Sequence, residues 1–183
     1  MSEISDFLPG KECEHCSLCG LCRQENNGHD WSCADEGKSP ILREQIFIQG
    51  RELCGESVSN PDCIYIKDAG LLAIEIKDRQ IEYVEKDDKK RLKNQLLSVC
   101  SASDRAGLKL KAFVLLVSSI KNSKHSDLKL FKACKEMFES IGITIDKNNM
   151  MRDSKHRGRK YTTFKVVKCK DLKEDLLTSL FVE

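Results

Sequence analysis

Residues 60–77 read NPDCIYIKDAGLLAIEIK, and this stretch decides how the rest of the chain is interpreted. Two apolar runs rich in β-branched residues, 63–67 and 71–77, flank a Lys-Asp-Ala-Gly sequence that has the composition of a tight turn. The pattern therefore predicts a β-hairpin. The second run is apolar on both faces up to Glu75, which is typical of a strand inside a sheet.

Three charged residues of this hairpin form a candidate catalytic site. Because side chains alternate along a strand, Glu75 and Lys77 point to the same face, and pairing of the two strands can bring Asp62 beside Glu75. Carboxylate oxygens suit Mg²⁺ or Mn²⁺, and such a cation polarises a phosphodiester and lowers the pKa of a bound water. We therefore predict Asp62 and Glu75 as metal ligands and Lys77 as a catalytic group. The alternative is an exposed cross-strand pair at a sheet edge, with Asp62 as a turn residue.

The remaining apolar periodicity predicts a mixed α/β domain. Its expected order is α-β-β-β-α-β-α-β-β-α, although the apolar run at residues 46–48 also fits a strand. Ser126 is a natural N-cap, and Gly142 follows the end of the same helix. We expect helices over residues 41–53, 87–101, 126–141 and 171–180, and further strands over residues 81–84, 110–118, 143–145 and 161–167.

Pro61-Asp62 and Glu75-Ile76-Lys77 match the motif of the PD-(D/E)XK nuclease superfamily, and the elements from residue 41 to residue 118 resemble its αβββαβ restriction-endonuclease-like core. Residues 61–79 resemble most the archaeal Holliday-junction resolvases and related small archaeal nucleases. The resemblance implies a metal-dependent endonuclease that hydrolyses DNA phosphodiesters, acts on branched or structured DNA in repair or recombination, and forms a homodimer.

The resemblance also implies further site residues. A glutamate from the first helix often completes the site in this family, which by position is Glu44, with Glu52 second. RecB-like members carry a glutamine on the following helix, where this chain has Gln95, but Val99 replaces the aromatic residue expected four positions later. The chain departs from the resolvases in its Cys-rich N-terminus, in its extension after Ser119 and in a short segment before Pro61.

The N-terminal region carries half of the ten cysteines in a cluster that indicates a metal site. Four of them follow a C-x₂-C-x₂-C-x₂-C spacing, and His29 and Cys33 follow as H-x₃-C. One Zn²⁺ could use a C-x₂-C pair with His29 and Cys33, whereas the strict three-residue steps favour a [4Fe–4S] cluster. A redox-active tail without metal is the third alternative. The candidate ligands are Cys13, Cys16, Cys19, Cys22, His29 and Cys33, and the five scattered cysteines are expected to be ordinary core residues.

Positive charge is concentrated near the C-terminus. Residues 1–60 hold 5 basic and 11 acidic residues, whereas residues 147–170 hold 9 basic residues against Asp153 alone, so this loop suits a polyanionic partner. Lysine and arginine bind phosphates, and an aromatic residue among them can stack on an unpaired base. The alternative is a solvated hairpin whose charged edge prevents aggregation. The candidate residues for binding nucleic acid, which we expect to be DNA with RNA as the alternative, are Lys155, Arg157, Arg159 and Lys160.

Composition and missing motifs exclude several classes of protein. The longest apolar stretch, residues 112–117, is too short to span a membrane, and no hydrophobic secretory segment opens the chain, so we expect an intracellular protein without a membrane partner. No Walker loop or G-x-S-x-G elbow is present. We predict a metal-binding module over residues 1–38 and a nuclease-like domain over residues 39–183. The alternative functions are a non-catalytic nucleic-acid-binding adaptor with a zinc-finger-like module and a redox sensor.

Overall fold

The computed structural model describes residues 45–182, except residues 56–58, 78, 120, 157–158, 169–170 and 172–173. The predicted Cys-rich module, with its six candidate ligands, lies outside the described residues, and so do Glu44 and Arg157. The described part is a mixed α/β structure, as expected from the sequence. Of the helices described there, none combines the length and the apolarity needed to cross a bilayer.

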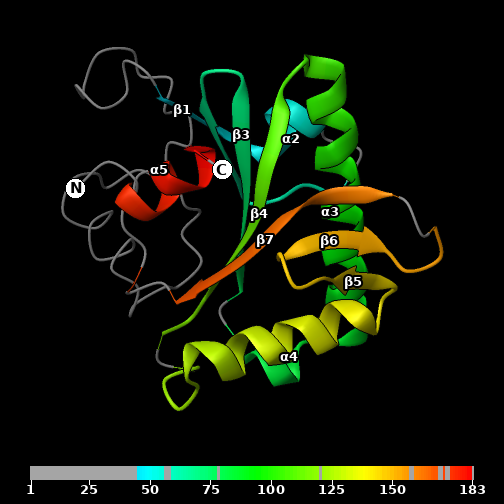
Figure 1. Ribbon diagram of the computed structural model, residues 1–183, viewed down its shortest axis with the longest axis vertical. Coiled ribbons are helices and arrows are strands. Elements are labelled where there is room, and N and C mark those ends of the chain that lie inside the picture. Colours follow the sequence, from blue (N-terminus) through cyan, green and yellow to red (C-terminus); the bar gives the residue numbers. More distant parts are fainter. Residues whose placement is uncertain are drawn as a thin grey trace.

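A mixed sheet of seven strands forms the centre of the described structure (Figure 1). Its spatial order is β1-β2-β3-β4-β7-β6-β5, so the first strands lie at one edge and the C-terminal hairpin at the other. The strands are β1 (Gln45–Gln49), β2 (Cys63–Lys67), β3 (Gly70–Lys77), β4 (Lys109–Val117), β5 (Ile143–Ile145), β6 (Met150–Asp153) and β7 (Lys160–Lys168).

The predicted hairpin is present, and its second strand is buried as expected. β2 and β3 pair antiparallel with Cys63 opposite Ile74, and every residue of β3 is buried. β4 then runs parallel to β3, with Glu75 beside Leu115, and β7 runs parallel to β4. The sheet therefore has three adjacent parallel strands whose carboxyl ends meet at one edge.

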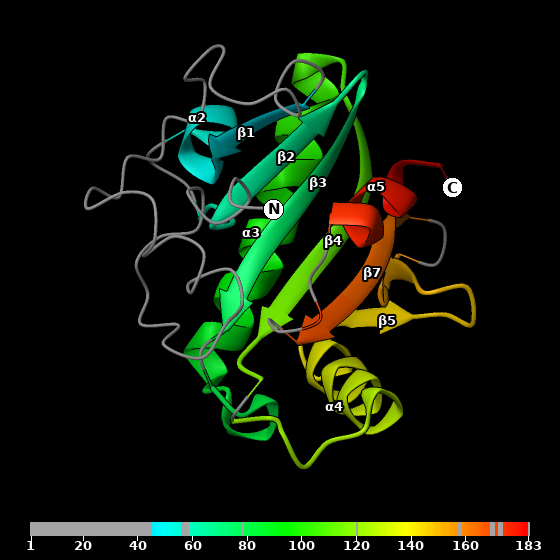
Figure 2. The ribbon, with the colours of Figure 1, turned by 90° about the vertical axis from the view of Figure 1, so that its left-hand side faces the viewer.

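Helices cover both faces of the sheet (Figure 2). α3 (Lys86–Ala106) and α4 (Asp127–Glu139) share one core with the sheet, in which the aromatic rings of Phe113, Phe138 and Phe164 pack edge to face. α5 (Glu174–Val182) lies on the other face, where the ring of Phe181 packs against that of Tyr65 at 5.3 Å between centroids. The Glu75 side chain lies on the face of the sheet that α3 covers, where it contacts Gln95 of that helix.

Two predicted elements have a different structure. The helix expected over residues 41–53 is wrong, because β1 and the five-residue helix α2 (Gly50–Cys54) occupy its described part. Ile46 pairs opposite Ile66 of β2, and these ladder hydrogen bonds outweigh a weak local helix preference. The strand expected over residues 81–84 is also wrong. This segment forms the 3₁₀ helix η3 (Ile81–Tyr83), where the Asn122 side chain accepts a hydrogen bond from the Ile81 N–H at 3.1 Å.

Strand β6 was not expected from the sequence. It pairs with β5, with Ile145 opposite Met151, and with β7 on its other side. Its sequence MMRD shows no period-two pattern and lies inside the basic loop. Its pairing therefore comes from the neighbouring strands rather than from its own composition.

The N-cap of α4 is as predicted and provides a test of local stability. The Ser126 hydroxyl accepts a hydrogen bond from the Lys129 N–H at 3.3 Å. We expect Ser126→Ala to lower the free energy of unfolding by about 1 kcal/mol, because one helix N–H loses its acceptor. Ser126→Asp, which keeps a capping acceptor, should unfold at the urea concentration of the wild type. Equal midpoints for the Ala and wild-type proteins would rule out this capping contribution.

Candidate functional site

Glu75 is the centre of the candidate site, and its carboxylate is completely buried on β3. Lys77, two residues further along the same face, donates from Nζ to Glu75 Oε1 at 2.9 Å. The other oxygen, Oε2, accepts hydrogen bonds from Gln95 Nε2 at 2.9 Å and from the Asp62 N–H at 3.1 Å. Three donors from three parts of the chain therefore fix the orientation of this carboxylate.

Asp62 lies immediately before β2 and is tied to β3 through its own side chain. Its Oδ2 accepts a hydrogen bond from the Ile76 N–H at 2.8 Å, while its backbone N–H binds Glu75. This reciprocal pair of bonds joins the beginning of β2 to the second half of β3. The structure thus brings together Asp62, Glu75 and Lys77.

The burial of Glu75 and Lys77 distinguishes between the two predicted arrangements, a site inside the sheet and an exposed cross-strand pair at its edge. An exposed cross-strand pair at a sheet edge requires both side chains to be in water, but β3 lies between β2 and β4. The Lys77 side chain is only 10% exposed and the Glu75 side chain 0%. Burial of two charges costs several kcal/mol per ion before their attraction is counted, so hydrophobic residues would be at least as stable here. The pair is therefore buried inside the sheet, and the interpretation as an exposed pair at a sheet edge is wrong.

Two amide side chains extend the site. Gln95, fully buried on α3, donates from Nε2 both to Glu75 and to the backbone oxygen of Asn60 at 2.8 Å. Among the described atoms, no hydrogen-bond partner reaches Gln95 Oε1 or Asn60 Oδ1, although both are buried. The resemblance indicated Gln95, whereas Asn60 was missed, because an asparagine before Pro-Asp has the composition of an ordinary turn.

The donor set fits a small hard cation. Mg²⁺ is held in proteins by one or two carboxylates and keeps several waters or substrate oxygens, and Asp62 and Glu75 supply such a pair. Buried amide oxygens without partners, as on Gln95 and Asn60, add hard acceptors beside that pair. Within the described residues, no group of three or more His, Cys, Asp or Glu side chains that could hold a metal ion is present. Asp62 and Glu75 are therefore the two described carboxylates that could contribute to a Mg²⁺ or Mn²⁺ site.

The predicted nucleic-acid-binding residues lie at the other end of the sheet. Lys160 begins β7, whereas Glu75 aligns across β4 with Val166, six residues further along that strand. At about 3.3 Å per residue, the two positions are about 20 Å apart along the strands. Lys155 and Arg159 belong to the same loop and are exposed. The structure does not bring the basic loop to the carboxylates.

Asp153 organises the described part of this loop. It accepts hydrogen bonds from the Lys155 N–H at 2.8 Å and from the Tyr161 hydroxyl at 2.9 Å, and His156 lies 3.3 Å away. These bonds, led by that of the Lys155 N–H, hold the pKa of Asp153 well below its usual value. The loop is therefore arranged around an ionised carboxylate.

The lowered pKa of Asp153 predicts a pH-dependent contribution to stability. A carboxylate whose pKa is lower in the folded protein stabilises it fully above the unfolded-state pKa of about 3.9, and this contribution is lost as the pH falls further. We expect Asp153→Asn to lower the urea midpoint at pH 7. We also expect the gap from the wild type to narrow between pH 4 and pH 2. A gap that stays constant over this interval would contradict the assignment.

The side chains of three of the five scattered cysteines are described, and all three are free thiols. Cys54 and Cys134 are buried in the core, as predicted, and Cys100 packs against it. Burial raises the pKa of Cys54 to about 11 and that of Cys134 to about 12, so both thiols are protonated and unreactive at neutral pH.

The chain was compared with protein-family models, with curated proteins and with solved structures, and nothing in any of the three matches it. A function for this chain therefore has to be argued from the sequence motif of residues 60–77 and from the geometry of the site.

Proposed function

We propose that this chain is a nuclease of the PD-(D/E)XK superfamily that hydrolyses DNA phosphodiester bonds with Mg²⁺ or Mn²⁺. The observation that carries the proposal is the hydrogen-bonded cluster of Asp62, Glu75 and Lys77. Asp62 is placed just before one strand, and Glu75 and Lys77 lie two residues apart on its antiparallel neighbour. Charged groups that are buried at a cost in desolvation free energy are expected where they act on a ligand.

The order of the elements around the cluster supports the proposal. The strands β1, β2 and β3 form an antiparallel meander, α3 follows, and β4 returns parallel to β3. This is the βββαβ part of the αβββαβ core that the resemblance implies. Glu44 directly precedes β1 in the sequence and remains the proposed fourth member of the site.

In the proposed reaction each residue of the cluster has a separate task. Asp62 and Glu75 would hold the divalent cation, which would lower the pKa of a bound water and neutralise charge on the phosphate. Lys77, fixed by Glu75 at 2.9 Å, orients the attacking water and stabilises the negative charge that develops on the phosphate oxygens. Gln95 positions Glu75 by its bond to Oε2. Its role is indirect because it acts through that carboxylate.

The substrate we propose is branched or structured DNA, cut by a homodimer. Support comes from the resemblance of residues 61–79 to the junction resolvases and from the exposed basic residues around β7. The N-terminal cysteine cluster would add a Zn²⁺ site or a [4Fe–4S] cluster. Optical absorption and elemental analysis of the purified chain distinguish these two groups.

The experiment that tests the function uses labelled branched, duplex and single-stranded DNA of the same sequence. The full chain is incubated with each DNA in Mg²⁺, in Mn²⁺ and in EDTA. We expect cleavage with either cation, strongest on branched DNA, and none in EDTA. If all three DNAs stay intact in both cations while the chain still binds them, the adaptor function replaces the nuclease.

A further inference from the structure

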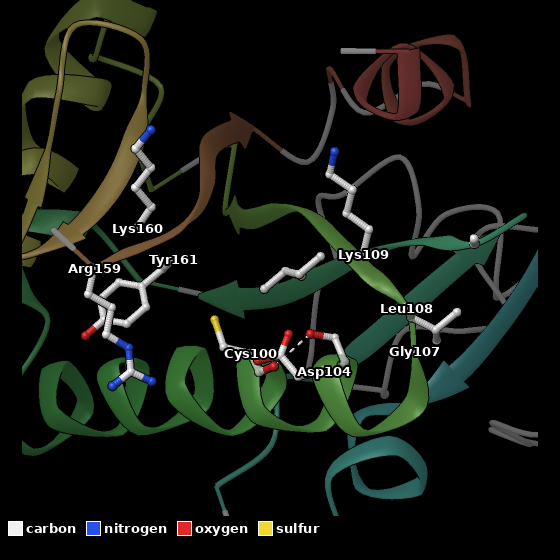
Figure 3. Close-up of a pocket in the computed structure, with 11 residues that line it drawn as sticks. Cys100, Asp104, Gly107, Leu108, Lys109, Arg159, Lys160 and Tyr161 are labelled. Carbon is white, nitrogen blue, oxygen red and sulfur yellow. Dashed lines mark hydrogen bonds between the residues drawn. The ribbon is translucent and has the colours of Figure 1, made fainter.

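Three lysines, Lys109 and Lys111 of β4 and Lys160 of β7, lie at the end of the sheet where these two strands begin. Figure 3 shows the side chains of Lys109 and Lys160 directed away from α3, toward the face of the sheet that α5 covers. Arg159 and Tyr161, the residues on either side of Lys160, point the opposite way, into a separate pocket beside α3. The charge of the lysines is therefore presented on the other face of the sheet from the Arg159 guanidinium.

The position of Lys111 follows from its contact with the neighbouring strand β3. A Cβ atom added to Gly70 of β3 would meet Lys111 Cγ at 3.3 Å and the Phe181 ring of α5 at 3.0 Å. Lys111 thus lies beside α5, on the same face as Lys109. This placement agrees with the alternation of side chains along a strand, which puts residues two apart on one face.

A pocket of about 240 Å³ is lined by Lys109, Lys111 and Lys160, and we call it the lysine pocket. Its walls include Leu180 of α5 and Thr163 of β7, whose hydroxyl is a hydrogen-bond donor of the kind that contacts phosphates. The volume is below the range typical of pockets that enclose a whole small molecule. The lysine pocket therefore suits a small anionic part of a larger ligand.

The charge of the lysine pocket is not balanced within the described structure. Among the described residues, no carboxylate forms an ion pair with any of the three lysines. Asp146, which follows β5, is bound instead by Arg152 of β6 at 2.9 Å, and Arg152 itself lies opposite Lys160. Like charges on neighbouring strands repel one another and lower stability. An external polyanion that binds at this pocket would remove that repulsion.

We propose that the lysine pocket binds the phosphodiester backbone of a nucleic-acid strand. Lys109 and Lys160 are well separated in Figure 3, so they suit different phosphates of one strand rather than a single phosphate. The choice of nucleic acid as the polyanion rests on the proposed function, whereas the binding itself needs neither the carboxylates nor a cation. The inference goes beyond that function, because it assigns a second nucleic-acid contact to the face of the sheet opposite Glu75.

The test measures equilibrium binding of the full chain in EDTA by fluorescence anisotropy, between about 50 and about 200 mM salt. The probe is a labelled DNA single strand of about 15 nucleotides. Each lysine that contacts a phosphate contributes about 0.7 to the slope of log affinity against log salt concentration. The double variant Lys109→Met/Lys111→Met should therefore lower this slope by about 1.4. An unchanged slope overturns the proposal.

Three comparisons locate the binding on the protein. Lys132→Met, which removes one exposed charge from α4 on the other side of the sheet, should leave the slope unchanged. Lys109→Arg/Lys111→Arg keeps both charges and should bind like the wild type. Lys160→Met should lower the slope more than Arg159→Met, because only Lys160 is directed to the face of α5. A larger loss in Arg159→Met, or an arginine double variant as weak as the methionine double variant, contradicts the proposal.

Urea unfolding shows whether the lost affinity reflects a lost contact or a damaged fold. Methionine keeps most of the unbranched stem of lysine and removes only the charge. The urea midpoint of Lys109→Met/Lys111→Met should therefore equal or exceed that of the wild type, because repulsion between like charges is relieved. A lower midpoint would mean that the two ammonium groups stabilise the fold through contacts within the protein, and it would overturn the proposal.

Two further probes separate a nucleic-acid backbone from other anions. A labelled glutamate peptide with as many charges as the DNA strand should bind the wild type several-fold more weakly, because its flexible side chains lose conformational entropy on binding. Inorganic phosphate, added at constant ionic strength, should not displace the strand, because a single phosphate cannot meet all three lysines. Equal affinity for the peptide, or displacement by inorganic phosphate, overturns the assignment to a nucleic-acid backbone.

Binding in EDTA also separates this proposal from the proposed nuclease function. A wild type that binds through the three lysines but cleaves no DNA in Mg²⁺ or Mn²⁺ supports the lysine pocket and contradicts the nuclease. A wild type that cleaves DNA, but whose methionine double variant keeps the full salt dependence, supports the nuclease and contradicts the lysine pocket.

Discussion

Asp62→Asn is expected to reduce Mg²⁺-dependent DNA cleavage by about a thousandfold, while the protein stays folded and still binds DNA. The reason is electrostatic, because in the proposed reaction the substitution removes one of the two negative charges that would hold the cation and align the phosphate. Asparagine keeps the shape of the side chain and an oxygen that accepts the Ile76 N–H, which Asp62 Oδ2 binds at 2.8 Å. The local hairpin structure should therefore survive.

Asp68→Asn is the matched control for this variant. Asp68 lies in the turn of the same hairpin, is exposed and has a φ of 51°, a left-handed conformation that asparagine tolerates well. Both substitutions remove one carboxylate charge from one hairpin, but only Asp62 touches the site. Single-turnover cleavage rates should show the loss in Asp62→Asn alone. Similar rates for the two variants would mean that Asp62 has no catalytic role.

The second large effect concerns stability, and it follows from the buried pair of Glu75 and Lys77. Replacement of one partner leaves the other charge buried without its counter-ion, so Glu75→Gln and Lys77→Met should each lower the free energy of unfolding by about 3 kcal/mol. The double variant removes both charges. Its loss should be well below the sum of the single losses, because a buried ion pair and a neutral pair of similar volume differ little in stability.

Urea unfolding in EDTA measures the free energies of unfolding of the wild type, the two single variants and the double variant. These four values form a double-mutant cycle without any contribution from a bound cation. The double variant is its internal control, since it carries both changes of side-chain shape but no unpaired charge. We expect a coupling energy of about 2 kcal/mol or more between the two positions. Additive losses would show that the 2.9 Å contact contributes little, and that the two side chains are not coupled in the folded protein.

The hairpin of β2 and β3 could be predicted because its signals are local. Apolar alternation, β-branched residues and a turn sequence all lie within residues 60–77. β1 could not be assigned with the same ease, since its pairing of Ile46 with Ile66 joins segments far apart in the chain. The same reason explains β6, whose four residues form a strand only between β5 and β7.

The candidate site was found because charged residues are costly in an apolar strand. Glu75 and Lys77 stand out at the end of β3 for that reason. Asn60 did not stand out, because its role depends on a backbone oxygen that receives a hydrogen bond from Gln95 on α3. The placement of the basic loop was also hidden from the sequence. It follows from the parallel pairing of β7 with β4, which sends the beginning of β7 to the end of the sheet away from Glu75.

The most direct test of the central claim counts Mn²⁺ ions bound by the folded chain. Electron paramagnetic resonance reports free Mn²⁺ during a titration with wild type, Asp62→Asn and Asp68→Asn, and any binding to the cysteine cluster is common to all three. If Asp62 and Glu75 hold the cation, the wild type and Asp68→Asn should each bind one more Mn²⁺ per chain than Asp62→Asn. Equal Mn²⁺ uptake by the wild type and Asp62→Asn would contradict the assignment of this cluster as a metal-dependent nuclease site.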